Sequence, residues 1–386
     1  MKLGNVCNVL NGFAFRSEKY VDEGIRIIRI SNVQKGYIED TTPVFYPSNS
    51  EEAIKYELEC GDILISLTGN VGRVAIITTE FLPAALNQRV ACLRIKNEIQ
   101  LDKSFLFNYL NSDRFEQQCI MSSKGVAQKN MSTEWLKEYE MPDLTIKQQK
   151  EISQILSELS TLILCGKRQL ARLDELVKSR FVEMFGFPGI DVYGWGMSSL
   201  GEICEINPKK SQDARLTSGL LVSFVPMPSV SESGDIDATQ VKPYDEVKTG
   251  FTYFAENDVL FAKITPCMEN GKGAVAIGLR NGIGFGSTEF HVLRPKKGMT
   301  TPCWIYTLTV FPQFRIDAAS NMTGSAGQRR VPASFLENYR VSVPPLELQN
   351  RFAAFVSEVD KSKLAVKQSL EKLETLKKSL MQQYFG

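Results

Sequence analysis

The sequence lacks what a zinc protein, a secreted protein or a membrane protein requires. Its 386 residues include one histidine, His291, and its eight cysteines form no C-x-x-C pair, so zinc ligands at closing distances are absent. No apolar run approaches about 18 residues, which excludes a membrane-spanning helix. The chain starts without the apolar region of a signal peptide. We therefore expect a cytoplasmic protein, without membrane partners, whose reduced cysteines pack as small hydrophobic residues.

An excess of one charge is also absent. The 45 Lys+Arg nearly balance the 44 Asp+Glu, giving a net charge of +1. No overall field therefore draws the chain to nucleic acid, and such a partner would have to be held by local basic loops. Hydrophobic residues make up 43% of the chain, which excludes disorder. The length predicts two or three domains.

The residue sets of common enzymes are missing. There is no G-x-x-x-x-G-K-[ST] phosphate loop. His291 lies in a strand-like run with no marked nucleophile, so we expect a structural histidine. Asn207-Pro-Lys-Lys only faintly resembles the Asn-Pro-Pro-aromatic motif of amino-methyltransferases, and Asp62 and Asp258 suit turn or capping roles. The sequence thus favours a protein without catalytic residues or a metal site; an enzyme with an unrecognised site is the alternative.

An internal repeat is the main feature that is present. Residues 128–186 match residues 328–386 without a gap at an offset of 200. The matched pairs include Gln128/Gln328, Leu136/Leu336, Tyr139/Tyr339, Gln149/Gln349, Leu164/Leu364, Lys167/Lys367, Leu170/Leu370, Leu173/Leu373, Leu176/Leu376 and Phe185/Phe385. Residues 11–59 and 209–256 share little. Each half therefore has a variable front and a repeated rear.

The repeated rear of each half predicts a long helix. Its apolar residues recur in alternating steps of four and three, a heptad seam. Proline precedes each helix, and Gly186 and Gly386 follow the last turns. About 37 helical residues at ~1.5 Å each give a rod of ~55 Å. The predicted helix-pair interface consists of Leu156, Leu159, Ile163, Leu170 and Leu173 with Val356, Val359, Val366, Leu370 and Leu373.

Two such seams in one chain favour an intramolecular antiparallel pair, with an intermolecular coiled coil as the alternative. The fronts alternate apolar and polar residues over 25–30, 62–67, 73–78, 89–95, 259–264 and 290–293, as strands do, and short helices are expected near 104–111 and 304–309. The predicted fold class is α+β with a pseudo-twofold internal repeat. Globular domains at 1–145 and 187–345 are separated by the paired helices 146–186 and 346–386.

Polar and cationic residues gather in loops of both fronts. Arginine can bind guanine, asparagine and glutamine can bind adenine, glutamate can accept a bond from cytosine, and lysine can hold phosphate. The candidates in the first half are Asn70, Arg73, Gln88, Arg89, Lys124, Gln128, Lys129 and Asn130. Those in the second half are Lys263, Thr265, Glu269, Asn270, Lys272, Thr288, Glu289, Gln328, Arg329 and Arg330. The clusters predict a DNA-binding surface, although any single residue can be an ordinary solvated one.

The order of these segments resembles the specificity (S) subunit of type I restriction–modification systems. The segments that carry the resemblance are Gly61-Asp-Ile-Leu-Ile-Ser, Gly69-Asn-Val-Gly-Arg-Val-Ala-Ile, Leu86-Asn-Gln-Arg-Val, Lys263-Ile-Thr-Pro-Cys-Met-Glu-Asn-Gly-Lys, Gly286-Ser-Thr-Glu-Phe, Met322-Thr-Gly-Ser-Ala-Gly-Gln-Arg-Arg-Val-Pro and Val343-Pro-Pro-Leu-Glu-Leu-Gln. The start of the first helix departs from the pattern, because Met141-Pro-Asp has a single proline.

The resemblance implies a bacterial or archaeal protein with two target recognition domains. Each would bind one half of a bipartite asymmetric site in double-stranded DNA, and the helix pair would set the spacing. The helices would dock two methyltransferase (M) subunits, and restriction/translocase (R) subunits would join the complex. S-adenosylmethionine would be bound by the M subunits, so no cofactor is expected in this chain. A coiled-coil scaffold with protein-binding end domains is the alternative.

Overall fold

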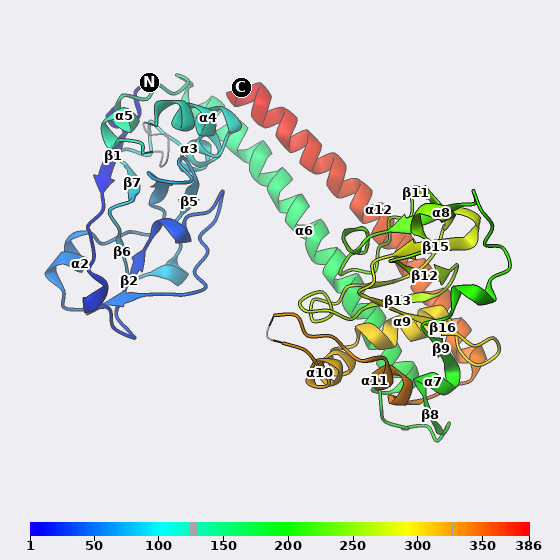
Figure 1. The fold of residues 1–386 in the computed structure, drawn as a ribbon. Coiled ribbons are helices and arrows are strands. Elements are labelled where there is room, and N and C mark those ends of the chain that lie inside the picture. The colour runs from blue at the N-terminus through cyan, green and yellow to red at the C-terminus, as the bar shows by residue number, and fades with distance from the viewer. Residues whose placement is uncertain (124–129, 326) are drawn as a thin grey trace. The chain divides into compact units, whose positions relative to one another are not determined.

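The computed structural model describes residues 1–123, 130–325 and 327–386 and divides into two compact units (Figure 1). Unit 1 consists of Met1–Lys167 and Gln368–Gly386. Unit 2 consists of Arg168–Lys367. The two long helices, α6 (Ile146–Phe185) and α12 (Leu346–Phe385), each contribute to both units. Each unit therefore contains one globular front and one part of each helix.

Unit 1 is built on two sheets. The antiparallel sheet has the order β1-β7-β4-β5, and the smaller sheet has the order β3-β2-β6 with β2 parallel to β6. The strands are β1 (Cys7–Asn11), β2 (Ile25–Ile28), β3 (Phe45–Tyr46), β4 (Ile63–Ser66), β5 (Val74–Ile76), β6 (Ala84–Leu86) and β7 (Val90–Ile95). The short helices are α1 (Leu3–Val6), α2 (Glu51–Lys55), α3 (Lys103–Leu110), α4 (Asp113–Ser122) and α5 (Thr133–Glu138).

Unit 2 repeats this plan. Its antiparallel sheet has the order β9-β16-β13-β14, its second sheet the order β11-β10-β15-β12 with β10 parallel to β15, and β8 pairs with β17. The strands are β8 (Met197–Ser199), β9 (Cys204–Ile206), β10 (Leu221–Val225), β11 (Val241–Pro243), β12 (Thr252–Ala255), β13 (Val259–Ala262), β14 (Gly273–Val275), β15 (Ile283–Gly286), β16 (Phe290–Pro295) and β17 (Arg340–Ser342). The helices are α7 (Leu200–Ile203), α8 (Tyr244–Val247), α9 (Pro302–Val310), α10 (Pro312–Ser320) and α11 (Ala333–Asn338).

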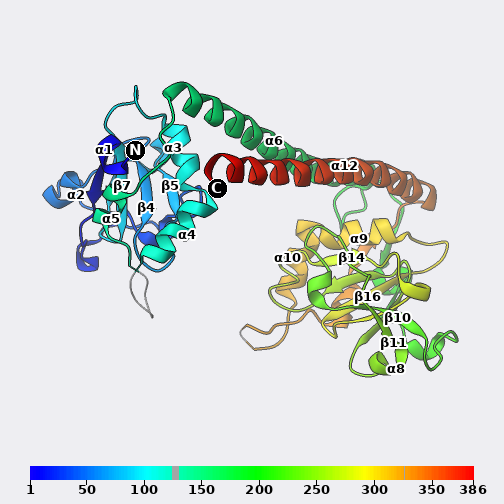
Figure 2. The same cartoon turned by 90° about the horizontal axis from the view of Figure 1, so that it is seen from above.

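The two long helices pair antiparallel in each unit, and they lie side by side in Figures 1 and 2. In unit 1, the Lys377 ammonium donates to Ser160 Oγ at 2.8 Å, and a Cβ on Gly166 would lie 2.7 Å from Leu370 Cδ2. In unit 2, Lys363 pairs with Asp174 at 2.7 Å. The predicted α+β class with an intramolecular antiparallel pair is confirmed.

The predicted interface positions of both helices are buried or half-buried, whereas most of their neighbours in sequence are exposed. Leu156, Leu159, Val359 and Leu370 are buried. The half-buried positions are Ile163, Leu170, Leu173, Val356, Val366 and Leu373. Lys363 and Lys377 stand at seam positions where apolar residues would be expected. Both are half-buried, and they form the contacts with Asp174 and Ser160 given above.

The helix ends anchor each core. Phe385 of α12 packs edge-on against Phe105 and Tyr109 of α3, with ring centroids 5.7 and 5.5 Å apart. In unit 2, Phe185 of α6 occupies the matching place and packs edge-on against Trp304 of α9, with ring centroids 6.4 Å apart. Such edge-to-face pairs add to the burial of large apolar side chains. Phe185 of α6 thus completes the core of unit 2, and its repeat, Phe385 of α12, completes the core of unit 1.

Among the helices described, none is long and apolar enough to cross a membrane. All eight cysteines are free thiols, of which Cys7, Cys92, Cys119 and Cys204 are buried and only Cys60 and Cys165 are exposed. Burial raises the pKa of the Cys7 thiol to about 12. The expectation that the cysteines are reduced thiols, several of them packed as hydrophobic residues, agrees with this placement.

Candidate nucleic-acid interface

The predicted polar residues of unit 2 surround one backbone ladder beyond the end of β13. The Lys263 amide donates to the Glu289 carbonyl at 2.9 Å, and the Lys263 carbonyl accepts from the Val331 amide at 2.9 Å. Ile264 forms an antiparallel bridge with Arg330. Three segments that are far apart in sequence therefore present Lys263, Glu289 and Arg330 together.

Unit 1 has the same ladder with other side chains. The Leu67 amide donates to the Arg89 carbonyl at 3.0 Å, and the Leu67 carbonyl accepts from the Met131 amide at 2.9 Å. Thr68 bridges Asn130 as Ile264 bridges Arg330. Arg89 and Asn130 of unit 1 therefore occupy the backbone positions of Glu289 and Arg330 in unit 2.

Two arginine–glutamate pairs order the cluster in unit 2. Arg330 Nε and Nη2 donate to the Glu289 carboxylate at 2.9 and 2.8 Å, a bidentate arrangement. Arg329 Nη2 lies 3.5 Å from the Glu269 carboxylate. The hydrogen bonds from Arg330 lower the pKa of Glu289, so this carboxylate stays charged near neutral pH.

The remaining predicted residues of unit 2 lie around the same ladder. Thr265 donates through its amide to the Arg329 carbonyl at 3.1 Å, and the Lys272 ammonium reaches the Met227 carbonyl at 3.5 Å. Asn270, Thr288 and Gln328 are exposed. Four cations, Lys263, Lys272, Arg329 and Arg330, face two carboxylates, Glu269 and Glu289, which leaves a local charge of +2 in a chain whose net charge is +1. A local excess of positive charge is what binding to a phosphate backbone would require of a nearly neutral chain.

The predicted residues of unit 1 are less tied to one another. Asn70, Gln88, Arg89 and Asn130 are exposed. Arg73, at the backbone position that Lys272 has in unit 2, donates through Nη1 to the Gln34 side chain. Three further candidates, Lys124, Gln128 and Lys129, lie outside the described residues.

Sequence reasoning missed two ion pairs with buried carboxylates at the other ends of the strands that lead to the ladders. Asp62 accepts from Arg94 Nε and Nη2 at 2.9 and 2.6 Å, and Asp258 accepts from Arg294 at 2.8 and 2.7 Å. The two aspartates also cap turns, as predicted, by accepting from backbone amides at 2.8 and 2.7 Å. The signal that could have revealed the pairs is Arg94/Arg294, which repeats the offset of 200.

His291 is structural, as predicted. It is buried, with Nε2 2.8 Å from the Val331 carbonyl and Nδ1 3.0 Å from Asn207 Nδ2. Burial lowers the pKa of His291, which keeps the ring neutral. Asn207, which follows β9, has φ +54°, and its side chain accepts from the Val292 amide at 3.0 Å. It therefore holds the end of β9 against β16.

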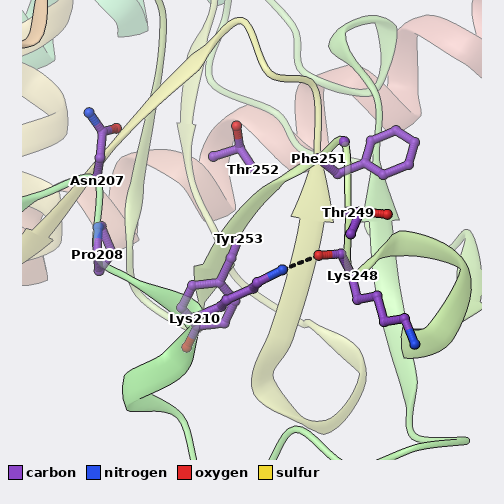
Figure 3. Close-up of a pocket in the computed structure, with 9 residues that line it drawn as sticks. Asn207, Pro208, Lys210, Lys248, Thr249, Phe251, Thr252 and Tyr253 are labelled. Carbon is purple, nitrogen blue, oxygen red and sulfur yellow. Dashed lines mark hydrogen bonds between the residues drawn. The ribbon is translucent and has the colours of Figure 1, made fainter.

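Sequence reasoning also missed a pocket of about 470 Å³ in unit 2 (Figure 3). The residues that line it come from the loop after β9, from the turn before β12 and from β12 itself. The Lys210 ammonium donates to the Lys248 carbonyl across the pocket. The lining residues are Asn207, Pro208, Lys210, Lys248, Thr249, Gly250, Phe251, Thr252 and Tyr253. They include two lysines and no carboxylate, so the pocket is suited to an anion. The two lysines gave no signal because they are 38 residues apart.

Across residues 1–123, 130–325 and 327–386, no group of three His, Cys, Asp or Glu residues could hold a metal ion. Neither ladder brings a nucleophile within hydrogen-bond distance of a base, since the only histidine bonds to a carbonyl and an amide. The chemistry that the two clusters can perform is directional hydrogen bonding to a polar, anionic surface.

The family model for the type I restriction modification DNA specificity domain matches residues 1–175 and 193–376. The specificity subunit of the type I restriction enzyme EcoAI from Escherichia coli is 44% identical over 161 residues, which are 41% of this chain and 26% of that protein. That of EcoEI, also from Escherichia coli, is 41% identical over 169 residues, 43% of this chain and 28% of the other. These matches span about a quarter of the length of either relative.

A longer match is to the putative MjaX specificity subunit from Methanocaldococcus jannaschii, at 23% identity over 93% of this chain and 84% of the other. Two solved structures share the fold along the whole chain. A structure of an assembled type I R-M system has a chain with a TM-score of 0.58 at 17% identity, 96% of which is covered. The S subunit from M. genitalium has a TM-score of 0.55 at 14% identity, with 95% covered.

Proposed function

This chain belongs to the family of type I restriction modification DNA specificity domains, and from that premise we propose that it is the DNA-recognition subunit of such a system. Each unit binds one half of a bipartite, asymmetric site in double-stranded DNA. The observation that carries this proposal is the shared ladder with different side chains. Arg89 and Asn130 stand in unit 1 where Glu289 and Arg330 stand in unit 2, and unlike side chains on one frame suit unlike base pairs.

The chain has no catalytic role in this proposal. Methylation and cleavage belong to M and R subunits, and S-adenosylmethionine is bound by the M subunit. The absence of a nucleophile–base pair from the described ladders supports this division of labour.

The long helices offer a repeated surface to two copies of one partner. Leu164 and Leu364 are 48% and 57% exposed, and Leu176 and Leu376 are both 47% exposed. Each pair keeps the offset of 200, so the same exposed apolar side chain occurs on both helices. Exposed apolar residues that recur on a surface favour a protein partner. We propose that two M subunits dock there, one on each helix.

The helix pair also sets the spacing of the two half-sites. Each helix has 40 residues, and at ~1.5 Å per residue such a helix is about 60 Å long. That length exceeds one turn of DNA, ~34–36 Å, which is the typical separation of half-sites bound by paired readers. Inserting one helical turn into both helices should increase the number of unread base pairs between the half-sites. An unchanged spacing would contradict this part of the proposal.

The test of the function is a selection from random duplexes with the full chain and its M subunits. The expected result is one split motif with two unlike halves, bound more tightly in the complex than by the chain alone. The chain alone, given S-adenosylmethionine and the selected duplex, should transfer no methyl group. A scaffold that binds proteins would retain no particular DNA sequence, and methylation by the isolated chain would contradict the non-catalytic role.

A further inference from the structure

The Arg330–Glu289 pair at the unit 2 ladder has donors to spare. A guanidinium carries five N–H groups. Two of them, on Nε and Nη2, bind the Glu289 carboxylate at 2.9 and 2.8 Å, and Nη1 donates to the Gln328 carbonyl at 3.2 Å. Two N–H groups remain, and the described residues supply no acceptor for them. The Arg330 side chain is 42% exposed and that of Glu289 is 24% exposed, so a ligand can reach the guanidinium.

The backbone beneath this pair is fixed on several sides. The Arg330 amide donates to the Thr323 carbonyl at 2.8 Å, and the Thr323 amide donates back at 2.9 Å. The Glu289 carbonyl accepts from Lys263, as described above. Behind the ladder, the His291 ring bonds to the Val331 carbonyl at 2.8 Å. The direction of the guanidinium is therefore set before any ligand binds, which reduces the entropy lost on binding.

We propose that Arg330 binds a guanine in the major groove, with Glu289 as its positioning residue. The inference rests on the proposed function and names the base that unit 2 recognises at this point. Guanine presents two adjacent acceptors, O6 and N7, and paired N–H donors of arginine match them. A phosphate can also accept paired donors, but positive charge alone can hold it, so a fixed direction of the guanidinium favours a base edge.

The inference also assigns the guanine to one half-site. Unit 1 has Asn130 at the backbone position of Arg330 and Arg89 at that of Glu289, so it lacks the clamped arginine. An asparagine matches the adenine edge instead. The guanine that depends on Arg330 should therefore occur only in the half bound by unit 2.

The experiment compares motifs selected from random duplexes by the full chain with its M subunits. The wild-type motif comes first. Arg330→Ala should lose the preference for guanine at one position of one half-site, by roughly 5- to 150-fold, which corresponds to the strength of a bidentate arginine–guanine pair. The other half-site should be unchanged. Arg89→Ala changes an arginine on the same ladder in unit 1, and it should leave the guanine preference of the unit 2 half-site unchanged.

Two further variants separate positioning from direct contact and from folding. Glu289→Gln keeps the size of the side chain but weakens the clamp, so it should reduce the preference at the same guanine by less than Arg330→Ala does. Arg330→Lys keeps the charge but lacks the planar fork that can bind the Glu289 carboxylate and a base edge at the same time. It should weaken the guanine preference while binding to unselected duplexes stays the same. Arg330→Lys decides the question if Arg330→Ala does not fold.

Three results would overturn the inference. The first is a uniform loss of affinity across sequences with a smaller salt dependence, which marks a phosphate contact. The second is an altered preference at a position that is not guanine, and the third is an unchanged motif. A wild-type complex that selects no motif would contradict the proposed function itself. The wild-type selection therefore distinguishes the two failures.

Discussion

Unit 1 and unit 2 place different side chains on the same backbone ladder. Leu67 in unit 1 and Lys263 in unit 2 each bond through the amide to the turn residue just before a strand, and through the carbonyl to a loop residue. At the other ends of β4 and β13, the ion pair Asp62–Arg94 is matched by Asp258–Arg294, so the ladder and the ion pair form the same frame in both units. The comparison teaches that the frame depends on backbone bonds and buried ion pairs, whereas the exposed side chains on the ladder are free to differ.

The largest expected effect comes from exchanging one front. Replacing residues 11–140 with the corresponding segment of another family member should change one half-site and leave the other. Binding to the original site should fall by about a hundredfold or more, because each mismatched base pair costs about 1–3 kcal/mol. The measurement is a selection from random duplexes with each version of the complex. A change in both half-sites would show that the two units are not independent readers.

The next largest effect tests whether the two frames are equally strong. Asp62→Ala and Asp258→Ala should each lower the free energy of unfolding of their unit by about 3 kcal/mol, because each removes the buried carboxylate that a half-buried arginine binds through two nitrogens. Arg94 keeps its pair with Glu59, but that carboxylate is exposed and contributes little. Urea denaturation at pH 7 measures both. Glu358→Ala is the control, since its pair with Lys361 is exposed and should contribute less than about 1 kcal/mol. Losses that differ by more than about 1 kcal/mol would contradict the equivalence of the frames.

A smaller effect concerns Gly166, a seam position whose repeat is Val366. A Cβ on Gly166 would lie 2.7 Å from Leu370 Cδ2. Gly166→Val should destabilise the chain by about 1–3 kcal/mol through overpacking. Gly166→Ala should be closer to neutral, since the gain of about 1 kcal/mol in helix propensity offsets part of the clash.

The clash at Gly166 can be isolated with a double-mutant cycle. Leu370→Ala removes the atoms that a larger side chain would meet, so Gly166→Val with Leu370→Ala should be less destabilising than the sum of the single changes. Thermal unfolding of the four proteins measures the coupling. Additive losses would mean that the two residues do not pack against each other.

The pH dependence should differ between the units, because unit 1 has Ala91 where unit 2 has His291. Burial lowers the pKa of His291 from its ordinary value of 6.5, so below pH 6.5 the unfolded chain binds the proton more readily than the folded chain. The stability of unit 2 should therefore fall as the pH drops from 6.5 toward the lower folded pKa.

The single histidine makes this measurable by nuclear magnetic resonance. The His291 ring should titrate below pH 6.5, and His291→Gln should remove its part of the stability change over the same pH range. A ring that titrates at or above 6.5 would contradict the burial argument.

The smallest effect tests the pocket of unit 2 that contains Lys210 and Lys248. If DNA phosphate occupies it, Lys210→Ala or Lys248→Ala should weaken binding uniformly across sequences and reduce the salt slope by about one. Lys361→Ala, on the exposed face of α12, is the control. An unchanged slope in both pocket variants would show that DNA does not reach the pocket.

The long helices and six of the strands could be predicted because their signals are local. Heptad spacing predicts α6 and α12, and alternation predicts β2, β4, β5, β7, β13 and β16; the predictions for these elements are confirmed. The shared topology of the variable fronts was not predicted. In both units a parallel strand pair, β2–β6 and β10–β15, lies where the sequences share little. Sheets are held by backbone bonds, so unlike side chains can build the same arrangement.

The candidate site was predicted as a set of residues but not as a set of partners. The bond from Arg73 to Gln34 and the pair of Arg330 with Glu289 join residues 39 and 41 positions apart. No motif links such positions, because their proximity follows from tertiary structure alone. The assignment of these residues to DNA stays a prediction.

The composition of unit 1 from both ends of the chain has a consequence for its synthesis. Phe385 packs in the core of unit 1, yet a ribosome adds it about 240 residues after the rest of that front. At about 5–20 residues per second, the nascent front waits roughly 10–50 s for its last core side chain. Unit 2, whose residues 168–367 are continuous, is translated without such a gap. The core of unit 1 is therefore completed later during translation than that of unit 2, and we expect unit 1 to be the part that a chaperone protects.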